Sequence, residues 1–315
     1  MKELSVKKDF SEIYTQDSPF PYLKEMRKLE YRISDTTKFF YKYLGNRLYR
    51  DLNRPIQILD IGSSYGINSC LLIYDLTMSD LDDFFLNRGE APTKEEARRF
   101  FRSLPKRNPH FKFYLVDISS PALRFAEDMG LCTQAFDLNL EQDEMSSSTS
   151  LLLGGVDMVI ATGCVGYIGY KSFTKLFEAI KNQTSSKEYR DERDISSGIV
   201  PKPLFAFSLL RIYSILEIQK VFENYGFVLL KSEIPPFRQR QFYDEQEKIK
   251  TISLLKEKRV VTTNLEDEGF YYADLYIGAP KEQKYALTSW VRSMENAFLL
   301  TSSSTKGQVY KKTDL

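Results

Sequence analysis

The fold of this chain is decided by the stretch IQILDIGSSYG, which runs from Ile56 to Gly66. Its first half is apolar and ends in an acid, Asp60, which predicts a buried strand. Gly62 lets the backbone adopt a positive φ or approach a ligand closely, and the segment Ile67–Tyr74 predicts a helix behind the turn. A strand, a turn and a helix in this order bring backbone N–H groups to the carboxyl edge of a sheet, where open α/β sheets bind ligands.

The spacing of the glycines limits which ligand this turn can hold. A dinucleotide fingerprint, G-x-G-x-x-G, beginning at Gly62 would need glycine where Ser64 and Ile67 stand. A P-loop would need a lysine directly after its second glycine, and no lysine follows Gly66. Both phosphate-binding motifs are therefore excluded, and the pattern that remains is Asp-x-Gly-x-x-x-Gly.

This pattern resembles the first motif of the class I S-adenosylmethionine-dependent methyltransferases, Asp/Glu-x-Gly-x-Gly-x-Gly, with Ser64 in place of the middle glycine. The resemblance covers roughly residues 55–232 and implies an α/β fold, a Rossmann-like seven-stranded sheet with helices on both faces. It also implies that S-adenosylmethionine is the cofactor. Asp60 would accept a hydrogen bond from its ammonium, directly or through water, and the turn of Gly62, Ser63, Ser64 and Gly66 would lie against its methionine part. Taken alone, the motif also fits an ordinary strand–helix turn.

A second strand is predicted over Phe111–Asp117, and it also ends in an acid. Ser119 or Ser120 suits the N-cap of a following helix. A carboxylate can accept hydrogen bonds from two vicinal hydroxyls, and the resemblance assigns the cofactor ribose to Asp117, with Ile118 beside it. The gap from Asp60 is much longer than the usual one of about 20 residues, so we expect an insertion at 76–110 with helices over 79–87 and 93–104.

The next two predicted strands supply further candidate site residues. The third covers 131–135, and the resemblance implies that Asp137 after it meets the adenine amino group while Leu138 forms a wall for the ring. The fourth covers 156–161 and is followed by a loop that begins at Thr162 and Gly163. The alternative for Asp137 and Leu138 is a polar turn at the surface. The alternative for Thr162 and Gly163 is a loop without a role in binding.

Composition excludes several classes of function. The net charge of +1 over 315 residues gives no global field that favours nucleic acid. No stretch approaches 18 apolar residues and the N-terminus lacks an apolar h-region, so we expect neither a membrane span nor secretion, but a cytoplasmic protein. The three cysteines are scattered, and without Cys-x-x-Cys or a histidine cluster we expect no metal site. The expected partner is a small-molecule substrate, and the oligomeric state stays open.

Three parts are expected along the chain. Residues 1–54 form an N-terminal helical cap, in which 17–22 is extended and a helix capped by Ser34 or Asp35 runs to about 52. Residues 55–280 form the S-adenosylmethionine-binding α/β domain, with insertions at 76–110 and 235–264, the second near the mouth of the site. Residues 281–315 form a C-terminal helix and a polar tail, disordered from 301. A helix is expected from 212 to 225, and a charged loop over 185–197. Tyr22 and Tyr31 are weak candidates for a lid.

The expected chemistry is methyl transfer to a small molecule. This reaction is an in-line displacement at a sulfonium, for which the protein supplies orientation and a desolvated site. Asn139, Tyr167 and Tyr170 are the polar groups expected nearest the reacting centre. The single histidine, His110, precedes the second strand and falls at the opposite edge of the sheet, so we do not expect it to be a base.

Two other functions stay open. The chain also resembles, more faintly, the azetidine-2-carboxylate synthases, which share the fold and make the cofactor's own amine displace methylthioadenosine. Such an enzyme needs an acceptor for a neutral amine, such as the Asn139 amide oxygen, and an aromatic face near the sulfonium, such as Phe136 or Tyr167. The third possibility is a non-catalytic binding module, against which the combination of Asp60 and Asp117 with the glycine turn argues.

Overall fold

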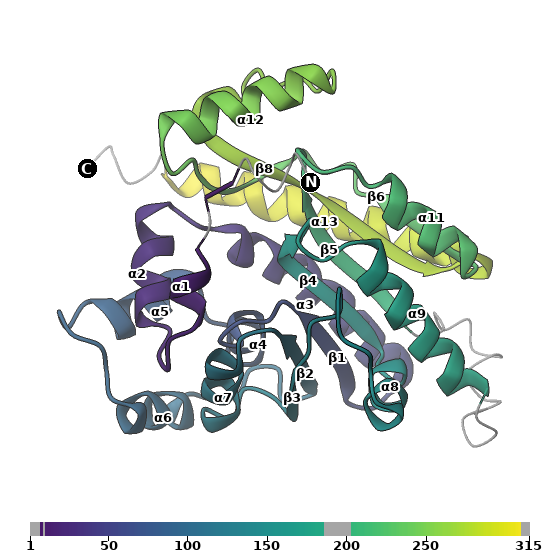
Figure 1. Cartoon of the computed structure of the whole chain (residues 1–315), viewed down its shortest axis with the longest axis horizontal. Helices are drawn as coiled ribbons and strands as arrows, with labels where there is room; N and C mark the ends of the chain where they lie inside the picture. The colour runs from purple at the N-terminus through teal and green to yellow at the C-terminus, as the bar shows by residue number, and fades with distance from the viewer. Residues whose placement is uncertain (1–6, 9, 186–202, 310–315) are drawn as a thin grey trace.

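The apolar segments of the chain assemble into one mixed sheet in the computed structural model, which describes residues 7, 8, 10–185 and 203–309 (Figure 1). Within these residues the sheet has eight strands, and its path runs β3-β2-β1-β4-β5-β8-β6, with β7 also paired to β8. Strands β1 to β5 pair in parallel, whereas β5, β6 and β7 each pair antiparallel with β8. The strands are β1 Ile56–Ile61, β2 Phe111–Asp117, β3 Gln134–Asp137, β4 Met158–Val165, β5 Leu204–Leu210, β6 Phe227–Lys231, β7 Phe237–Gln241 and β8 Phe270–Pro280.

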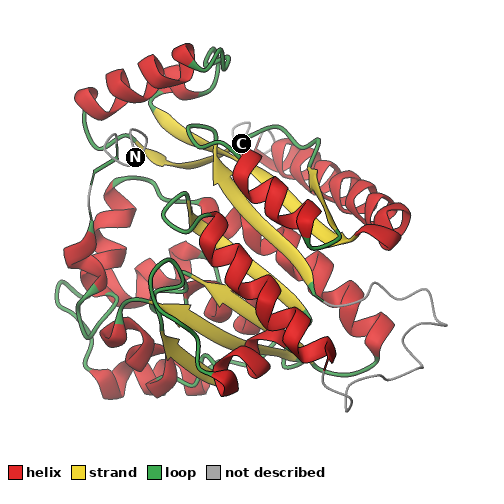
Figure 2. Ribbon diagram, turned by 45° about the vertical axis from the view of Figure 1, so that its right-hand side comes forward, coloured by secondary structure: helices red, strands yellow, loops and turns green. Residues whose placement is uncertain are grey.

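Side-chain alternation along the strands divides the core into two layers, one on each face of the sheet (Figure 2). In β1, Ile58 packs into one apolar cluster, and Leu59 and Ile61 pack into the other. Helices α3, α4, α7 and α13 contribute to the first cluster, and α8, α9 and α11 to the second. The predicted α/β class, Rossmann-like with helices on both faces, is therefore confirmed, with one strand more than expected.

The helices begin and end at the following residues. They are α1 Ser11–Tyr14, α2 Phe20–Lys28, α3 Ile33–Leu52, α4 Ile67–Tyr74, α5 Met78–Leu86, α6 Lys94–Ser103, α7 Ser120–Asp128, α8 Ser147–Gly154, α9 Tyr170–Ser185, α11 Leu216–Asn224, α12 Glu245–Glu257 and α13 Lys284–Val309, with 3-10 turns η2 Glu266–Glu268 and η3 Lys281–Gln283. The bounds of β2 and α4 agree with the sequence prediction. Thr77 and Thr93 form capping boxes at α5 and α6, which explains why these two helices were also predictable from local sequence.

Three predicted bounds are wrong. The third strand begins at Gln134, where its pairing with β2 begins, rather than at residue 131. β4 continues to Val165, so Thr162 and Gly163 belong to a strand and not to a loop, because Val165 still pairs with Leu209 of β5 beyond a register shift. Helix α11 starts at Leu216, because residues 210–213 form a turn, closed by the backbone N–H of Tyr213 donating to the carbonyl of Leu210.

The N-terminal cap is more helical than predicted. Residues 20–22 are the start of α2, because Pro19 and Pro21 stand at its N-terminus, where proline is tolerated. The N-cap of α3 is Arg32, so Ser34 and Asp35 lie inside the helix. The Asp35 carboxylate instead accepts from the backbone N–H of Met78 and joins the cap to α5.

The two insertions and the C-terminal segment pack against the same sheet. The insertion at 76–110 contains the helices α5 and α6, and α5 contacts α2 of the cap. The insertion at 235–264 contains β7 and α12. Helix α13 extends to Val309 and so includes residues 301–309 of the segment that was expected as a polar tail. Residues 186–197 of the predicted charged loop and residues 310–315 lie outside the described residues. In the part of the chain that the structure describes, no helix combines the length and apolarity that crossing a membrane requires.

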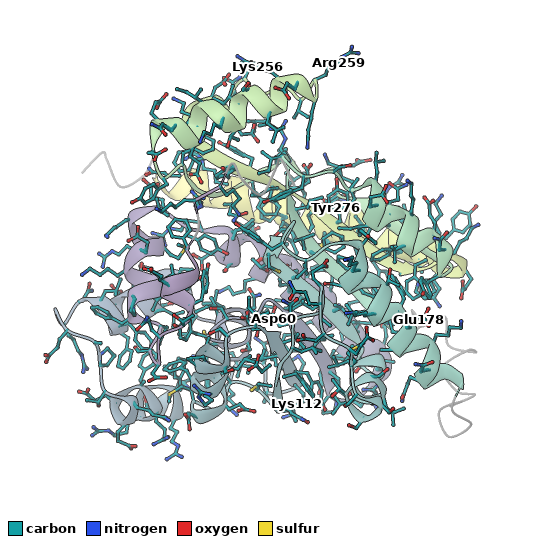
Figure 3. All side chains as sticks on the ribbon, in the orientation of Figure 1. Asp60, Lys112, Glu178, Lys256, Arg259 and Tyr276 are labelled. Carbon is teal, nitrogen blue, oxygen red and sulfur yellow. The ribbon has the colours of Figure 1, made fainter. Side chains whose placement is uncertain are left out.

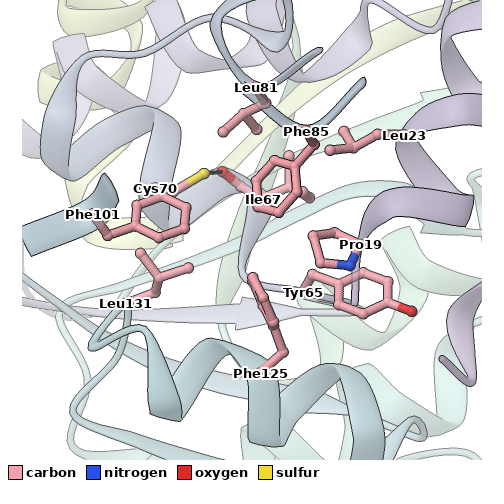
Figure 4. Close-up of a pocket in the computed structure, with 10 residues that line it drawn as sticks. All are labelled: Pro19, Leu23, Tyr65, Ile67, Cys70, Leu81, Phe85, Phe101, Phe125 and Leu131. Atoms are coloured by element: carbon pink, nitrogen blue, oxygen red, sulfur yellow. Dashed lines mark hydrogen bonds between the residues drawn. The ribbon is translucent and has the colours of Figure 1, made fainter. Parts of the chain in front are cut away.

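A small void lies in the core between α2, α4, α5 and α6 (Figure 4). Its volume is about 10 Å³, and apolar side chains such as Leu23, Phe85 and Phe125 line it. The one hydrogen bond drawn there joins the Cys70 thiol to the backbone carbonyl of Ile67. A space of this size holds about one water molecule at most, and its lining offers no set of polar partners for one. The void is therefore a packing feature and not a ligand site.

Candidate functional site

A cavity of about 740 Å³ lies at the carboxyl ends of β1, β2 and β4. The strand order reverses between β1 and β4, and a crevice at such a switch point is the usual ligand site of an open α/β sheet. The turn after β1 and the ends of β2, β3 and β4 form one wall, and the N-terminal cap together with β7 forms the other. The volume falls in the range of roughly 300–1,000 Å³ that is typical of small-molecule sites.

The turn after β1 is left-handed at three positions. Gly62, Ser64 and Gly66 have φ of 65°, 50° and 72°. A Cβ at Gly62 would lie 2.7 Å from both Cβ and Sγ of Cys164 on β4, so a larger residue does not fit there. Ser64 adopts the left-handed conformation at a steric cost, which gives a physical reason why glycine is usual at this place in the motif.

Asp117 is the acid that reaches the cavity most directly. Its Oδ2 accepts from the backbone N–H of Ser64 at 2.8 Å, and its Oδ1 accepts from the N–H of Ser119 at 2.9 Å. Burial raises the pKa of Asp117, and these two bonds partly oppose that shift. Because an ionised carboxylate has about four acceptor positions, Asp117 keeps capacity for two ligand hydroxyls.

Asp60 is buried beneath the floor of the site, near the middle of the molecule, and does not itself line the cavity (Figure 3). Its Oδ1 accepts from the Asn68 side-chain amide at 3.1 Å, and its Oδ2 has no partner among the described residues. Burial raises the pKa of Asp60 to about 8, with only partial compensation from Asn68. The hydroxyls of Ser63 and Ser64, which line the cavity, are also buried without a partner in the described part of the chain. Buried polar atoms without partners are rare, so this cluster indicates a site suited to a polar ligand.

At the end of β3, only some of the predicted site residues reach the cavity. Leu138 and Asn139 line the cavity, as does the exposed Ile118 after β2. Asp137 does not line it, and its carboxylate accepts from the hydroxyl of Ser120 at the start of α7. The Asn139 side-chain oxygen accepts from the backbone N–H of Glu141 at 3.0 Å, so one of its lone pairs is already used.

The end of β4 supplies the remaining predicted residues. Thr162 and Gly163 line the cavity, and the Thr162 hydroxyl lies 2.9 Å from the hydroxyl of Tyr41 on α3, which joins the cap to the sheet. Tyr167 also lines the cavity and is half exposed. Tyr170 is the first residue of α9 and does not line the cavity, because the chain turns away between the two tyrosines.

The opposite wall contains the two lid candidates and also residues that the sequence analysis did not assign. Both lid candidates, Tyr22 and Tyr31, line the cavity, and so do Lys7 and Gln239. The phenol oxygen of Tyr31 would lie 2.7 Å from a Cβ at Gly163, so the cap and β4 approach closely at that glycine. Only Gln239 had a sequence signal, since its insertion was expected near the mouth of the site.

A buried ion pair supports this second wall. Arg240 donates two hydrogen bonds of 2.8 and 2.7 Å to Glu247 on α12, and both side chains are less than 5 % exposed. Glu247 also accepts from the backbone N–H of Lys8 at 2.8 Å, which attaches the N-terminal segment to the insertion. Arg240 therefore lines the cavity with its charge already balanced.

Sequence comparison assigns the chain to no group: no family model and no curated protein matches it. Structures similar to it include an S-adenosylmethionine-dependent methyltransferase from Aquifex aeolicus, 11 % identical, covering 72 % of this chain and 83 % of that chain, with a TM-score of 0.34. The 1,6-didemethyltoxoflavin-N1-methyltransferase of Burkholderia thailandensis is 10 % identical, and the match covers 75 % of this chain and 76 % of that chain, with a TM-score of 0.35. The magnesium protoporphyrin IX methyltransferase of Synechocystis is 10 % identical, and the match covers 89 % of this chain and 93 % of that chain, with a TM-score of 0.36. These comparisons describe a fold and assign no residue of this chain a role.

Proposed function

We propose that this protein is an S-adenosylmethionine-dependent methyltransferase that acts on a small molecule. The observation that carries the proposal is the Asp117 carboxylate at the cavity, held by backbone N–H groups of the left-handed turn and of α7. A carboxylate fixed in this way suits the two vicinal hydroxyls of a ribose. The same turn brings the small residues Gly62 and Ser63 to the cavity, where the backbone can lie against a ligand.

The floor of the site suits the cationic end of the cofactor. S-adenosylmethionine supplies an activated methyl group on a sulfonium and carries an ammonium on its amino-acid part. The unpartnered Oδ2 of Asp60, together with the free hydroxyls of Ser63 and Ser64, matches an ammonium that arrives directly or through water. Ile118 and Leu138 provide apolar surface for the adenine, whereas Asp137 would have to leave Ser120 to reach it.

The rest of the cavity would hold the acceptor. Tyr167 and Asn139 lie on the sheet side, and Tyr22 and Tyr31 lie on the cap side. Their task would be to orient the acceptor and exclude water, since in-line displacement needs alignment above all. Asn139 supports the alternative cyclisation less well, because its amide oxygen already accepts from Glu141.

Incubation of the pure protein with S-adenosylmethionine tests the proposal. Adenosylhomocysteine that forms only when a pool of small molecules is added would support methyl transfer. Methylthioadenosine formed without any acceptor would support the cyclase instead. A chain that binds S-adenosylmethionine but releases neither product would point to a binding module. A chain that does not bind S-adenosylmethionine by calorimetry would refute every cofactor-based function.

A further inference from the structure

The cavity has two walls of different charge. Asp117 belongs to the wall made by β1 and β2, with Asp60 buried behind the lining residue Asn68, and Lys7 lines the cavity from the N-terminal segment. The Nζ of Lys7 lies 4.7 Å from the ring centre of Tyr167 and 5.9 Å from that of Tyr271. A lysine in this position is held by aromatic faces, which attract a cation without neutralising its charge.

The other charged groups that the structure describes near Lys7 do not neutralise it. Arg240 and Glu247 form their own bidentate pair, so together they contribute no net charge. Lys8 is exposed at the rim, where water and salt screen it. Among the residues that the structure describes, this wall therefore presents one uncompensated positive charge, which suits a single negative charge on a ligand.

We propose that Lys7 binds a carboxylate in this site, either the amino-acid carboxylate of the cofactor or a carboxylate on the acceptor. The inference rests on the proposed function, because it assigns a further contact within the same site. A carboxylate suits the position better than a phosphate, since one net positive charge balances a monoanion and not a dianion.

The electrostatics of Lys7 agree with this geometry. Burial, and then the positive charge of Arg240, lower the pKa of Lys7 to about 7, while Glu247 and Cys164 oppose the shift. Burial thus disfavours the ammonium form in the protein alone. An anion at hydrogen-bonding distance would favour that form and raise the pKa.

Calorimetry on the full chain and three variants tests the proposal. Lys7→Met removes the charge, Lys7→Arg keeps it, and Lys24→Met removes an exposed lysine of α2 as a matched control. The cofactor probes are S-adenosylmethionine and its decarboxylated form. The acceptor probes, measured with S-adenosylhomocysteine present, are phenylacetate and phenylacetamide.

We expect Lys7→Met to weaken binding of one carboxylate probe by roughly ten- to a hundredfold and its neutral counterpart by much less. Lys7→Arg should restore most of the affinity, and Lys24→Met should not change it. If Lys7→Met loses affinity for S-adenosylmethionine alone, Lys7 binds the carboxylate of the cofactor. If it loses affinity for phenylacetate alone, Lys7 binds a carboxylate on the acceptor. Unchanged affinity of Lys7→Met for both carboxylates would overturn the inference while leaving the proposed function intact. Failure of the wild-type chain to bind either cofactor form would instead count against the proposed function.

Discussion

The role of Asp117 gives the sharpest test of the cofactor site. Asp117→Ala removes a carboxylate that lines the cavity and accepts from Ser64 and Ser119. A hydrogen bond to a charged group contributes about 1.5–3 kcal/mol, so losing the equivalent of one such bond should raise the Kd for S-adenosylhomocysteine roughly ten- to a hundredfold. The half-buried position limits the loss, because water can partly replace the carboxylate.

Isothermal titration calorimetry measures this effect, and two further variants make it specific. Asp117→Asn keeps the size of the side chain but places an NH2 group against the backbone N–H of Ser64 or Ser119, so its loss of affinity should be at least as large as that of Asp117→Ala. Asp128→Ala removes a partly buried acid at the end of α7 that pairs with Lys94 outside the cavity, and it should leave the Kd unchanged. Thermal unfolding checks that each variant is folded. A folded Asp117→Ala protein with wild-type affinity would remove Asp117 from the cofactor site.

Three further predictions follow from the same geometry. Asp137→Ala should change the Kd for S-adenosylhomocysteine less than about threefold, because its carboxylate is bound to Ser120 outside the cavity; a loss as large as that of Asp117→Ala would instead support contact with the adenine. The unfolded chain releases the proton of Asp60 near the ordinary aspartate pKa of 3.8 and the folded chain holds it to about 8, so this group makes unfolding progressively easier as pH rises between those values. Asp60→Asn should therefore raise the melting temperature more at pH 8 than at pH 5, and an equal shift at both would contradict the argument. Gly62→Ala should lower the urea-unfolding free energy by about 1–3 kcal/mol more than Gly130→Ala, since both have left-handed φ but only the first adds a clash, with Cys164; equal losses would show that the turn can relax.

Local sequence was enough to predict the core of the fold. The apolar stretch of β1, its glycines and the helix behind them depend on side-chain periodicity and on backbone freedom, which are properties of neighbouring residues. The helices of the first insertion were predictable for the same reason, since a capping box is complete within four residues. Where bounds depended on a partner strand, as for β3 and β4, local patterns placed them wrongly.

Some residues of the candidate site were likewise predictable from local sequence, and others were not. Asp60, the left-handed turn and Asp117 could be predicted, because strand ends of a parallel sheet meet at one edge and each acid stands within the last two residues of its strand. That Asp117 faces the cavity while Asp137 bonds to Ser120 depends on where α7 packs, and no local pattern states it. Lys7 and Gln239 reach the cavity only because the N-terminal segment and β7, about 230 residues apart in the chain, are joined through Arg240 and Glu247. The sequence by itself determined the sheet, its glycine turn and the acids of one wall, whereas the second wall was decided only by long-range packing and a buried ion pair.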